Sequence, residues 1–168
     1  MRKGLLGSSN AALVIVSNTS PLIALKHAEI LHALGLLLKS VVVPPAVLAE
    51  LKVKEEEVFS KLEFLQVIAP QNKEMVFHLK RIVDEGEAEA ITLAVEHSAW
   101  LLIDDLKGRK VARRLGVKVV GTLGILKIAK QKEFLSDVGS AIKRMKARGF
   151  YIADEIVDRF LKEVDEEG

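Results

Sequence analysis

The chain contains no cysteine among its 168 residues, which excludes disulfides, thiolate catalysis and cysteine-based zinc sites. It also lacks an uninterrupted apolar segment long enough to cross a bilayer, so we expect no membrane association. The formal net charge is only +2 and the sequence pI is about 8.8. That balance permits a nucleic-acid partner without indicating one.

Motifs of several enzyme classes are also absent. There is no P-loop, no Gly-x-Gly-x-x-Gly after the first apolar run and no Gly-x-Ser-x-Gly elbow, which removes most support for nucleotide-fuelled, dinucleotide-dependent and serine-hydrolase functions. The four histidines show no metal-ligand spacing, and we assign them no role. An aspartyl-phosphate mechanism of the haloacid-dehalogenase type requires an Asp after the first strand, where Asn18 stands.

Length and composition are those of one folded domain, with 49% hydrophobic and 29% charged residues. We expect a single domain over residues 13–168, preceded by a flexible N-terminal extension over residues 1–12. The apolar stretch in that extension is short and interrupted, so it is a poor signal peptide. Abundant Lys and Glu, with few Asn, Gln and Met, are typical of a heat-adapted cytoplasmic protein.

Short apolar runs alternate with helical segments along the chain. Strands are predicted over residues 13–16, 41–43, 65–68, 100–103 and 117–120. Helices are predicted over residues 20–34, 46–61, 72–83, 88–97 and 109–115, and from residue 123 onward. Continuous apolar strands separated by helices predict an α/β fold: a three-layer α/β/α sandwich with a central, mainly parallel sheet.

An apolar stripe near the carboxyl end has helical spacing. Its members are Ile156, Val157, Phe160, Leu161 and Val164. Such a stripe either closes the core of its own domain or mediates a homodimer, and we favour the first interpretation.

An acidic or amide side chain stands at four places where a predicted strand ends or a helix begins. These residues are Asn18, Glu50, Glu87 and the pair Asp104–Asp105. In an open α/β sheet, ligand-facing groups gather outside the carboxyl ends of the strands, so separated residues can meet at one edge. Oxygen ligands without histidine or cysteine favour Mg²⁺ or Mn²⁺. The sequence therefore predicts a divalent-metal site.

The first of these places has a structural alternative. Asn18 suits a turn, Ser20 can cap the following helix, and Pro21 suits the first helical position. Thr19 and Ser20 also place hydroxyls at a helix start, where a phosphate or a metal-bound water can be held. Both interpretations stay open for these residues.

The two glutamates have structural alternatives as well. Glu50 adjoins Val47 and Val53 at helical spacing, which suits a solvated carboxylate at the edge of an apolar stripe. Asp84 and Glu87 stand three residues apart at a helix start, as in a capping box. Glu87 nevertheless shares the inward helix face with Ile91 and Ala94, where a carboxylate requires a partner. Glu89 falls on a more solvent-facing row.

Asp104 and Asp105 close an apolar strand, on which successive side chains point to opposite faces. We therefore expect one of them to face the crevice and the other to cap the next helix or support its neighbour. Lys107, Arg109 and Lys110 follow at once. Such a run is usually a solvated helix face, but beside an acidic crevice it can also neutralise the phosphates of a bound strand.

Together these segments resemble the PIN-domain family, small metal-dependent ribonucleases that include toxins of prokaryotic toxin–antitoxin pairs. The motifs that carry the resemblance are Ser17–Ile23, Pro44–Leu51, Gly86–Ala90, Leu101–Asp105 and Gly121–Gly124. The resemblance implies a PIN-like fold, a Mg²⁺ or Mn²⁺ cofactor, RNA as substrate, and an antitoxin-like protein or a second copy as partner. It assigns the acidic positions to Asn18, Glu50, Glu87 and Asp105, with Asp104 as an additional ligand.

Asn18 departs from the acid that the family carries at this position. An amide oxygen can bind a cation but contributes no charge, so weaker metal binding is expected. Three hypotheses follow: a metal-dependent endoribonuclease, a catalytically degenerate PIN-like domain that binds RNA or a protein without cleavage, and a metal-dependent phosphatase acting on small esters.

Overall fold

A five-stranded sheet forms the centre of the computed structural model, which describes residues 14–38 and 40–166. The strands are β1 (Val14–Ser17), β2 (Ser40–Val43), β3 (Leu65–Val67), β4 (Trp100–Leu102) and β5 (Val119–Val120). They lie in the order β3-β2-β1-β4-β5, and every neighbouring pair is parallel. The predicted parallel α/β fold is thereby confirmed. The extension predicted over residues 1–12 lies outside the described residues.

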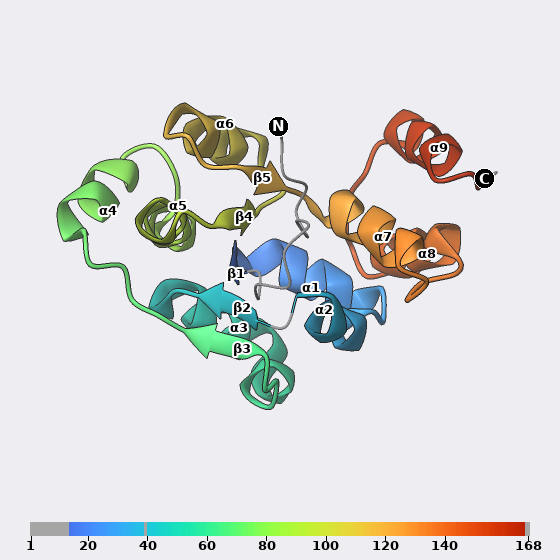
Figure 1. Ribbon diagram of the computed structural model, residues 1–168, viewed down its shortest axis with the longest axis horizontal. Helices are drawn as coiled ribbons and strands as arrows, with labels where there is room; N and C mark the ends of the chain where they lie inside the picture. Colours follow the sequence, from blue (N-terminus) through green and yellow to red (C-terminus); the bar gives the residue numbers. More distant parts are fainter. Residues whose placement is uncertain (1–13, 39, 167–168) are drawn as a thin grey trace.

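Helices cover both faces of the sheet (Figure 1). One face carries α1 (Thr19–His27), α2 (Leu31–Leu38), α3 (Pro45–Ser60), α7 (Thr122–Gln131), α8 (Val138–Ala147) and α9 (Asp154–Glu163). The other face carries α4 (Lys73–Leu79), α5 (Glu85–His97) and α6 (Leu106–Arg114). This arrangement is the predicted three-layer sandwich.

Successive side chains along a strand point to opposite faces of the sheet, so each central strand contributes to both hydrophobic cores. Ile15 packs into the core beneath α1 and α7, whereas its neighbour Val16 packs into the core beneath α5. In β4, Leu101 and Leu102 divide between the two cores in the same way. Strands buried on both faces read as unbroken apolar runs, which is why the sequence revealed them.

The chain reverses direction across the sheet between β1 and β4. From β1 it proceeds outward through β2 to β3, and it then returns to the other side of β1 to form β4 and β5. Two central strands therefore send their following segments to opposite faces, and in open α/β sheets the carboxyl ends of such strands are where ligands bind. Asn18 follows β1 and the Asp104–Asp105 pair follows β4, so these residues flank this topological switch point.

The helix predicted over residues 20–34 is in fact two helices. Glu29 adopts a left-handed φ of 63°, and Ile30 N–H donates to Leu25 O at 3.1 Å, which closes the end of α1. Gly35, expected to end the helix, lies inside α2, where a Cβ would collide with the ring of Phe64. Contacts distant in sequence thus override the local stop signal.

Other helix bounds also differ from expectation. The helix predicted over residues 109–115 begins at Leu106, the helix predicted over residues 72–83 ends at Leu79, and the segment from residue 123 onward contains α7, α8 and α9. The N-cap of α1 is Asn18, not Ser20, and Pro21 is consequently the third helical residue, not the first. The helix predicted from residue 88 begins at Glu85, because Asp84 caps it.

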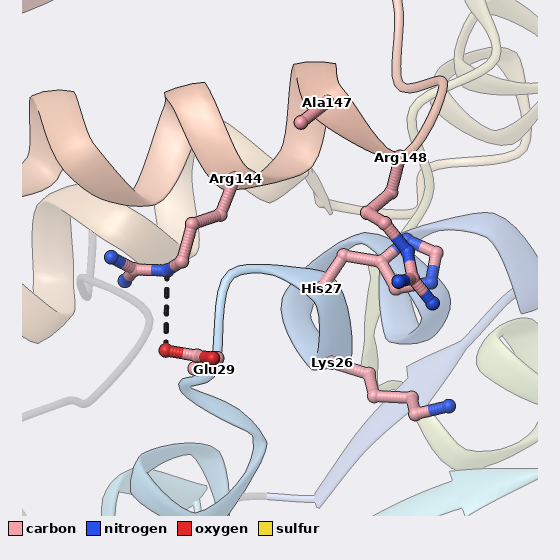
Figure 2. A pocket seen from close by; sticks show the side chains of 6 residues that line it. All are labelled: Lys26, His27, Glu29, Arg144, Ala147 and Arg148. Carbon is pink, nitrogen blue, oxygen red and sulfur yellow. Dashed lines mark ion pairs between the residues drawn. The ribbon is translucent and has the colours of Figure 1, made fainter.

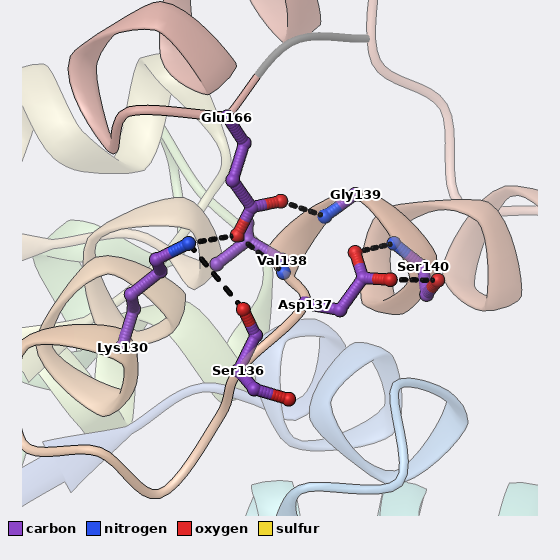
Figure 3. Close-up of polar contacts among 7 residues, drawn as sticks. All are labelled: Lys130, Ser136, Asp137, Val138, Gly139, Ser140 and Glu166. Atoms are coloured by element: carbon purple, nitrogen blue, oxygen red, sulfur yellow. Dashed lines mark hydrogen bonds and ion pairs between the residues drawn. The ribbon is translucent and has the colours of Figure 1, made fainter.

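The carboxyl-terminal segment is fastened to α8 by one carboxylate (Figure 3). Glu166 accepts hydrogen bonds from the backbone N–H groups of Val138 and Gly139, both at 2.9 Å, and pairs with Lys130. In the apolar stripe of α9, Phe160 belongs to the core, whereas Ile156 is half exposed. Most of the stripe thus covers the domain's own core.

Among the described residues, no single helix combines the length and apolar composition that a membrane span requires. The pair α1 and α2 meets that test together, but a 119° bend separates the two helices.

Candidate metal centre

Asn18 lies at the carboxyl end of β1, in contact with the end of β4. Its backbone N–H donates to Leu102 O at 3.0 Å, and the residue is 7% exposed. Although Asn18 occupies the N-cap position of α1, its side chain makes no capping hydrogen bond. The hydroxyl Oγ1 of Thr19 is buried without a partner within the described part of the chain, whereas Ser20 is exposed. The start of α1 therefore holds two buried polar side chains that do not cap the helix.

Glu87 takes part in two sets of contacts at the start of α5. It completes a capping box with Asp84, because Glu87 N–H donates to Asp84 Oδ1 at 2.8 Å and Asp84 N–H donates to Glu87 Oε2 at 3.2 Å. The other oxygen, Oε1, faces Gly108 of α6, beside the carboxylate of Asp105. One oxygen of Glu87 therefore completes the capping box, while the other lies beside Asp105, where a metal ligand was expected.

The surroundings of Glu87 disfavour its charged form. Burial is the largest cause, the carboxylate of Asp84 adds to it, and the charge of Asp105 with its hydrogen bond to Glu87 adds further. Together they raise the pKa of Glu87 from 4.5 to about 7, despite the backbone hydrogen bond from Asp84, which lowers it. Crowded carboxylates with a raised pKa are the arrangement that a bound cation relieves.

Asp105 combines a capping role with a place beside Glu87. It is the N-cap of α6, and its Oδ2 accepts from Gly108 N–H at 2.8 Å. A Cβ built on Gly108 would lie 3.5 Å from this oxygen and 3.3 Å from Glu87 Oε1. Glycine at this position therefore leaves room for both carboxylates at the start of α6.

Asp104 turns to the next helix instead. Its two oxygens accept from Thr122 N–H at 2.8 Å and from the Thr122 hydroxyl at 2.5 Å. A Cβ on Gly121 would lie 2.8 Å from Asp104 Oδ1 and 2.7 Å from Arg109 Nη1, so the aspartate and the arginine meet beside this glycine. Asp104 thus fixes the start of α7, while Asp105 faces the Glu87 carboxylate.

Glu50 reaches the start of α5 from α3. A Cβ on Gly86 would lie only 2.7 Å from Glu50 Oε1, so the carboxylate occupies the space that the glycine leaves. Glu50 is half-buried and Val47 is buried, but Val53 is 85% exposed and does not share their stripe as expected.

Glu89 was expected on a solvent-facing row, but it is half-buried and accepts from Ala46 N–H at 3.2 Å. Burial raises its pKa, and the hydrogen bond from Ala46 works against that shift. This carboxylate joins α5 to the first turn of α3, the helix that carries Glu50. No local pattern could reveal it, because the two partners are 43 residues apart.

Three glycines near helix starts were also missed as parts of the site. Gly86, Gly108 and Gly121 each lie where a methyl group would meet a carboxylate oxygen. Gly86 stands next to Glu87 in one of the quoted motifs and Gly121 begins another, whereas Gly108 lies outside all of them. Their closest contacts with carboxylates come from segments that are distant in sequence, so no local pattern indicates them.

The donor chemistry suits a hard divalent cation, since the available groups are carboxylate, amide and hydroxyl oxygens. The structure brings Glu87 and Asp105 together and places Glu50 against the start of the same helix. Within residues 14–38 and 40–166, however, no three acidic or histidine side chains converge closely enough to hold an ion. The unpartnered Thr19 hydroxyl and the raised pKa of Glu87 are the features that fit a cation here.

The basic residues after Asp105 divide into two kinds. Lys107 and Lys110 are exposed on α6. Arg109 is half-buried; burial and then the neighbouring charge of Arg113 lower its pKa, and Asp104 opposes that shift. Arg109 is therefore held beside Asp104, whereas the two lysines extend into solvent.

Two solved structures are similar to this chain. A PilT N-terminus domain protein from the hyperthermophilic archaeon Sulfolobus solfataricus is 21% identical, with 66% of this chain and 87% of that chain covered and a TM-score of 0.46. VapBC2 from Rickettsia felis, bound to a DNA fragment from its promoter, is 18% identical, with 65% and 98% covered and a TM-score of 0.49. The curated proteins include no significant match.

A sequence model described as a PIN domain (DUF3368) matches residues 14–166, nearly the whole chain. The resemblance deduced from the motifs is confirmed, and the chain belongs to the PIN-domain family.

Proposed function

We propose that this protein is a metal-dependent endoribonuclease, with Mg²⁺ or Mn²⁺ held at the carboxyl edge of β1 and β4. One observation carries the proposal: Glu87 and Asp105 lie together at the switch point, and the pKa of Glu87 is raised to about 7. Each of these two carboxylates accepts one backbone hydrogen bond, Glu87 from Asp84 and Asp105 from Gly108. Their nearest charged neighbours are nevertheless other acids, and they share a hydrogen bond with each other.

The residues of the edge divide the work. Glu87 and Asp105 would hold the ion, and Glu50 would join them from α3. Asn18 would be a neutral oxygen ligand, and the buried hydroxyl of Thr19 would orient a ligand or water. A bound Mg²⁺ or Mn²⁺ supplies a water of lowered pKa and positive charge for the phosphate under attack.

Other groups support this edge. Asp104 holds the start of α7 through Thr122 and steadies Arg109. Arg109, with Lys107 and Lys110 on the exposed side of α6, would steer the RNA backbone towards the carboxylates. Ser20 is exposed on the first turn of α1 and would contact the RNA strand there, away from the basic residues of α6.

The decisive experiment replaces one carboxylate with its amide. Asp105→Asn should reduce Mn²⁺ affinity in calorimetry and RNA cleavage with Mn²⁺ by about 100-fold or more, because even outer-shell partners of a metal are worth roughly 10–100-fold. Asp137→Asn is the matched control, since Asp137 caps α8 through Ser140 as Asp105 caps α6 through Gly108. Equal Mn²⁺ binding and cleavage in the two variants and the natural protein would refute the proposal.

Asn18 favours a second candidate, a degenerate PIN domain that binds RNA or a protein without cutting it. The amide removes one negative charge from the proposed ligand set. Asn18→Asp separates the two candidates. If the natural protein neither binds Mn²⁺ nor cleaves RNA, and the variant does both, the degenerate function is supported.

Partners follow from family membership alone, and they are part of the proposal. We include an antitoxin-like protein and a homodimer among them. Light scattering of the purified chain, with and without a co-expressed neighbouring open reading frame, tests both.

A further inference from the structure

A basic hollow lies where α1 and α8 end side by side (Figure 2). It has a volume of about 340 Å³, and its lining includes Lys26 and His27 of α1 and Arg144 of α8, together with Arg148. The acidic group in its lining is Glu29. The hollow is separate from the carboxylate edge, since α1 begins at that edge and ends here.

Part of this positive charge has a structural explanation. Arg144 donates to Ala28 O from Nη2 at 2.8 Å and from Nε at 3.3 Å, and its Nε lies 3.4 Å from a carboxylate oxygen of Glu29. Arg144 therefore satisfies the carboxyl end of α1 and engages the acid of the hollow. Its guanidinium is held in place by these contacts.

Arg148 has no comparable explanation. It is the C-cap residue of α8, and its backbone N–H, not its guanidinium, bonds to Met145 O and Lys146 O. Its side chain is exposed and extends into the hollow towards His27 (Figure 2). The exposed guanidinium of Arg148 therefore adds positive charge to the hollow beyond the pair formed by Arg144 and Glu29.

We propose that the basic hollow binds a backbone phosphate of single-stranded RNA, outside the carboxylate edge. The identification of the anion as RNA rests on the proposed function. The exposed Arg148 side chain offers paired N–H donors that match phosphate oxygens. The hollow is large enough for a phosphate together with its ribose.

The fold sets the distance between the two places. At 1.5 Å per residue, α1 is about 12 Å long from Thr19 to His27, so the hollow lies at least one helix length from Asn18 at the carboxylate edge. An RNA strand with one phosphate at the hollow and another at the carboxylates would have to span more than this length. The hollow would thus select for substrates longer than a dinucleotide.

The test measures RNA binding without metal, so that cleavage plays no part. The variant Lys26→Gln with Arg148→Gln is compared with Lys132→Gln with Lys162→Gln, which removes the same charge from exposed positions outside the hollow. Binding of a labelled RNA oligonucleotide is followed by fluorescence anisotropy in EDTA over a salt series. The hollow variant should bind about tenfold more weakly at low salt, and the slope of log affinity against log salt should flatten by about 1.4.

Arg148→Gln alone is the second variant, because Lys26 makes additional contacts. It should flatten the salt slope by about 0.7 while the melting temperature stays unchanged. An unchanged slope, or equal flattening in the control pair, overturns the inference. The inference is also overturned if a polyglutamate peptide binds the hollow and RNA cannot displace it. The occupant would then be an acidic protein segment. The two proposals can fail separately. If the salt slopes change as expected but Asp105→Asn alters neither Mn²⁺ affinity nor RNA cleavage, RNA binding at the hollow is supported and the nuclease function is refuted.

Discussion

Two glutamates occupy similar positions in this fold and experience opposite environments. Glu87 lies at the start of α5 and Glu166 lies against the start of α8. Burial and neighbouring acids raise the pKa of Glu87 to about 7. Burial also works to raise the pKa of Glu166, but Lys130 and the N–H groups of Val138 and Gly139 outweigh it and leave that pKa lowered.

The contrast shows what a structural carboxylate looks like in this protein. At Glu166 the chain supplies a cation and two backbone donors, so the charge is neutralised (Figure 3). At Glu87 it supplies one backbone donor and two further acids. Glu87 and Asp105 cap helices, but their mutual repulsion opposes folding, and a crowded acidic cluster beside a topological switch point supports a functional role.

After the loss expected for Asp105→Asn, the next largest effect should come from adding one methyl group at the start of α5. In Gly86→Ala the new Cβ would lie 2.7 Å from Glu50 Oε1 and displace this carboxylate. Mn²⁺ affinity and cleavage should fall about tenfold, whereas stability should rise slightly, because alanine favours a helix by up to roughly 1 kcal/mol. Calorimetry and thermal melting measure the two quantities.

Gly139→Ala is its control, since Gly139 is likewise the second residue of its helix and lies beside Glu166. The nearest atoms to its new Cβ would be 3.4–3.5 Å away, an ordinary contact. Metal affinity should not change in this variant. Unaltered affinity in Gly86→Ala as well would exclude Glu50 from the ligand set.

The next effect is a pH dependence that belongs to Glu87. Because its pKa is about 7 when folded and 4.5 otherwise, the folded state binds more protons between these values, and the free energy of unfolding falls as pH rises through this range. Glu87→Gln should therefore be more stable than the natural protein at pH 8, on the order of 1 to 2 kcal/mol, with little gain at pH 4. Urea denaturation at both pH values measures this difference.

The exposed neighbour Glu85 provides the comparison for that experiment. Glu85→Gln should show no such gain at either pH. A gain of equal size there would mean that relief of general repulsion at the start of α5, not the position of Glu87, explains the result.

The smallest effect has the opposite sign. Since the pKa of Glu166 is lowered, its contribution to stability is present above the unfolded pKa and is lost as pH falls through the folded value. Glu166→Gln should destabilise the protein at neutral pH by roughly 0.5 to 1 kcal/mol. Thermal melting at neutral and acidic pH should show this difference shrinking on acidification.

The sequence predicted the layers of the fold because both cores draw on the same strands. Ile15 and Val16 are adjacent yet belong to different cores, and so do Leu101 and Leu102, so the central strands β1 and β4 read as apolar runs that are easily recognised. Helix ends were predicted less well. The end of α1 depends on a left-handed Glu29, and the continuation of α2 past Gly35 depends on Phe64, which no local pattern contains.

Within the candidate site, the sequence indicated which acids stand at strand ends but not what each one contacts. Asp104 and Asp105 are adjacent, yet one binds Thr122 of α7 and the other caps α6 beside Glu87. The direction of each side chain depends on the helix that packs next to it. For the same reason Glu89 was assigned to solvent, although it bonds to the start of α3.

The hydrogen bond between Glu89 and Ala46 has a mechanical consequence. One short stretch of α5 is attached to α3 through Glu89 and touches α6 through Glu87. A molecule that moves α3 away from the sheet would also displace this stretch of α5. The separation of Glu50, Glu87 and Asp105 would then change without direct contact with any of them. A protein bound to the exposed side of α3 would therefore change the proposed metal site without contacting its carboxylates.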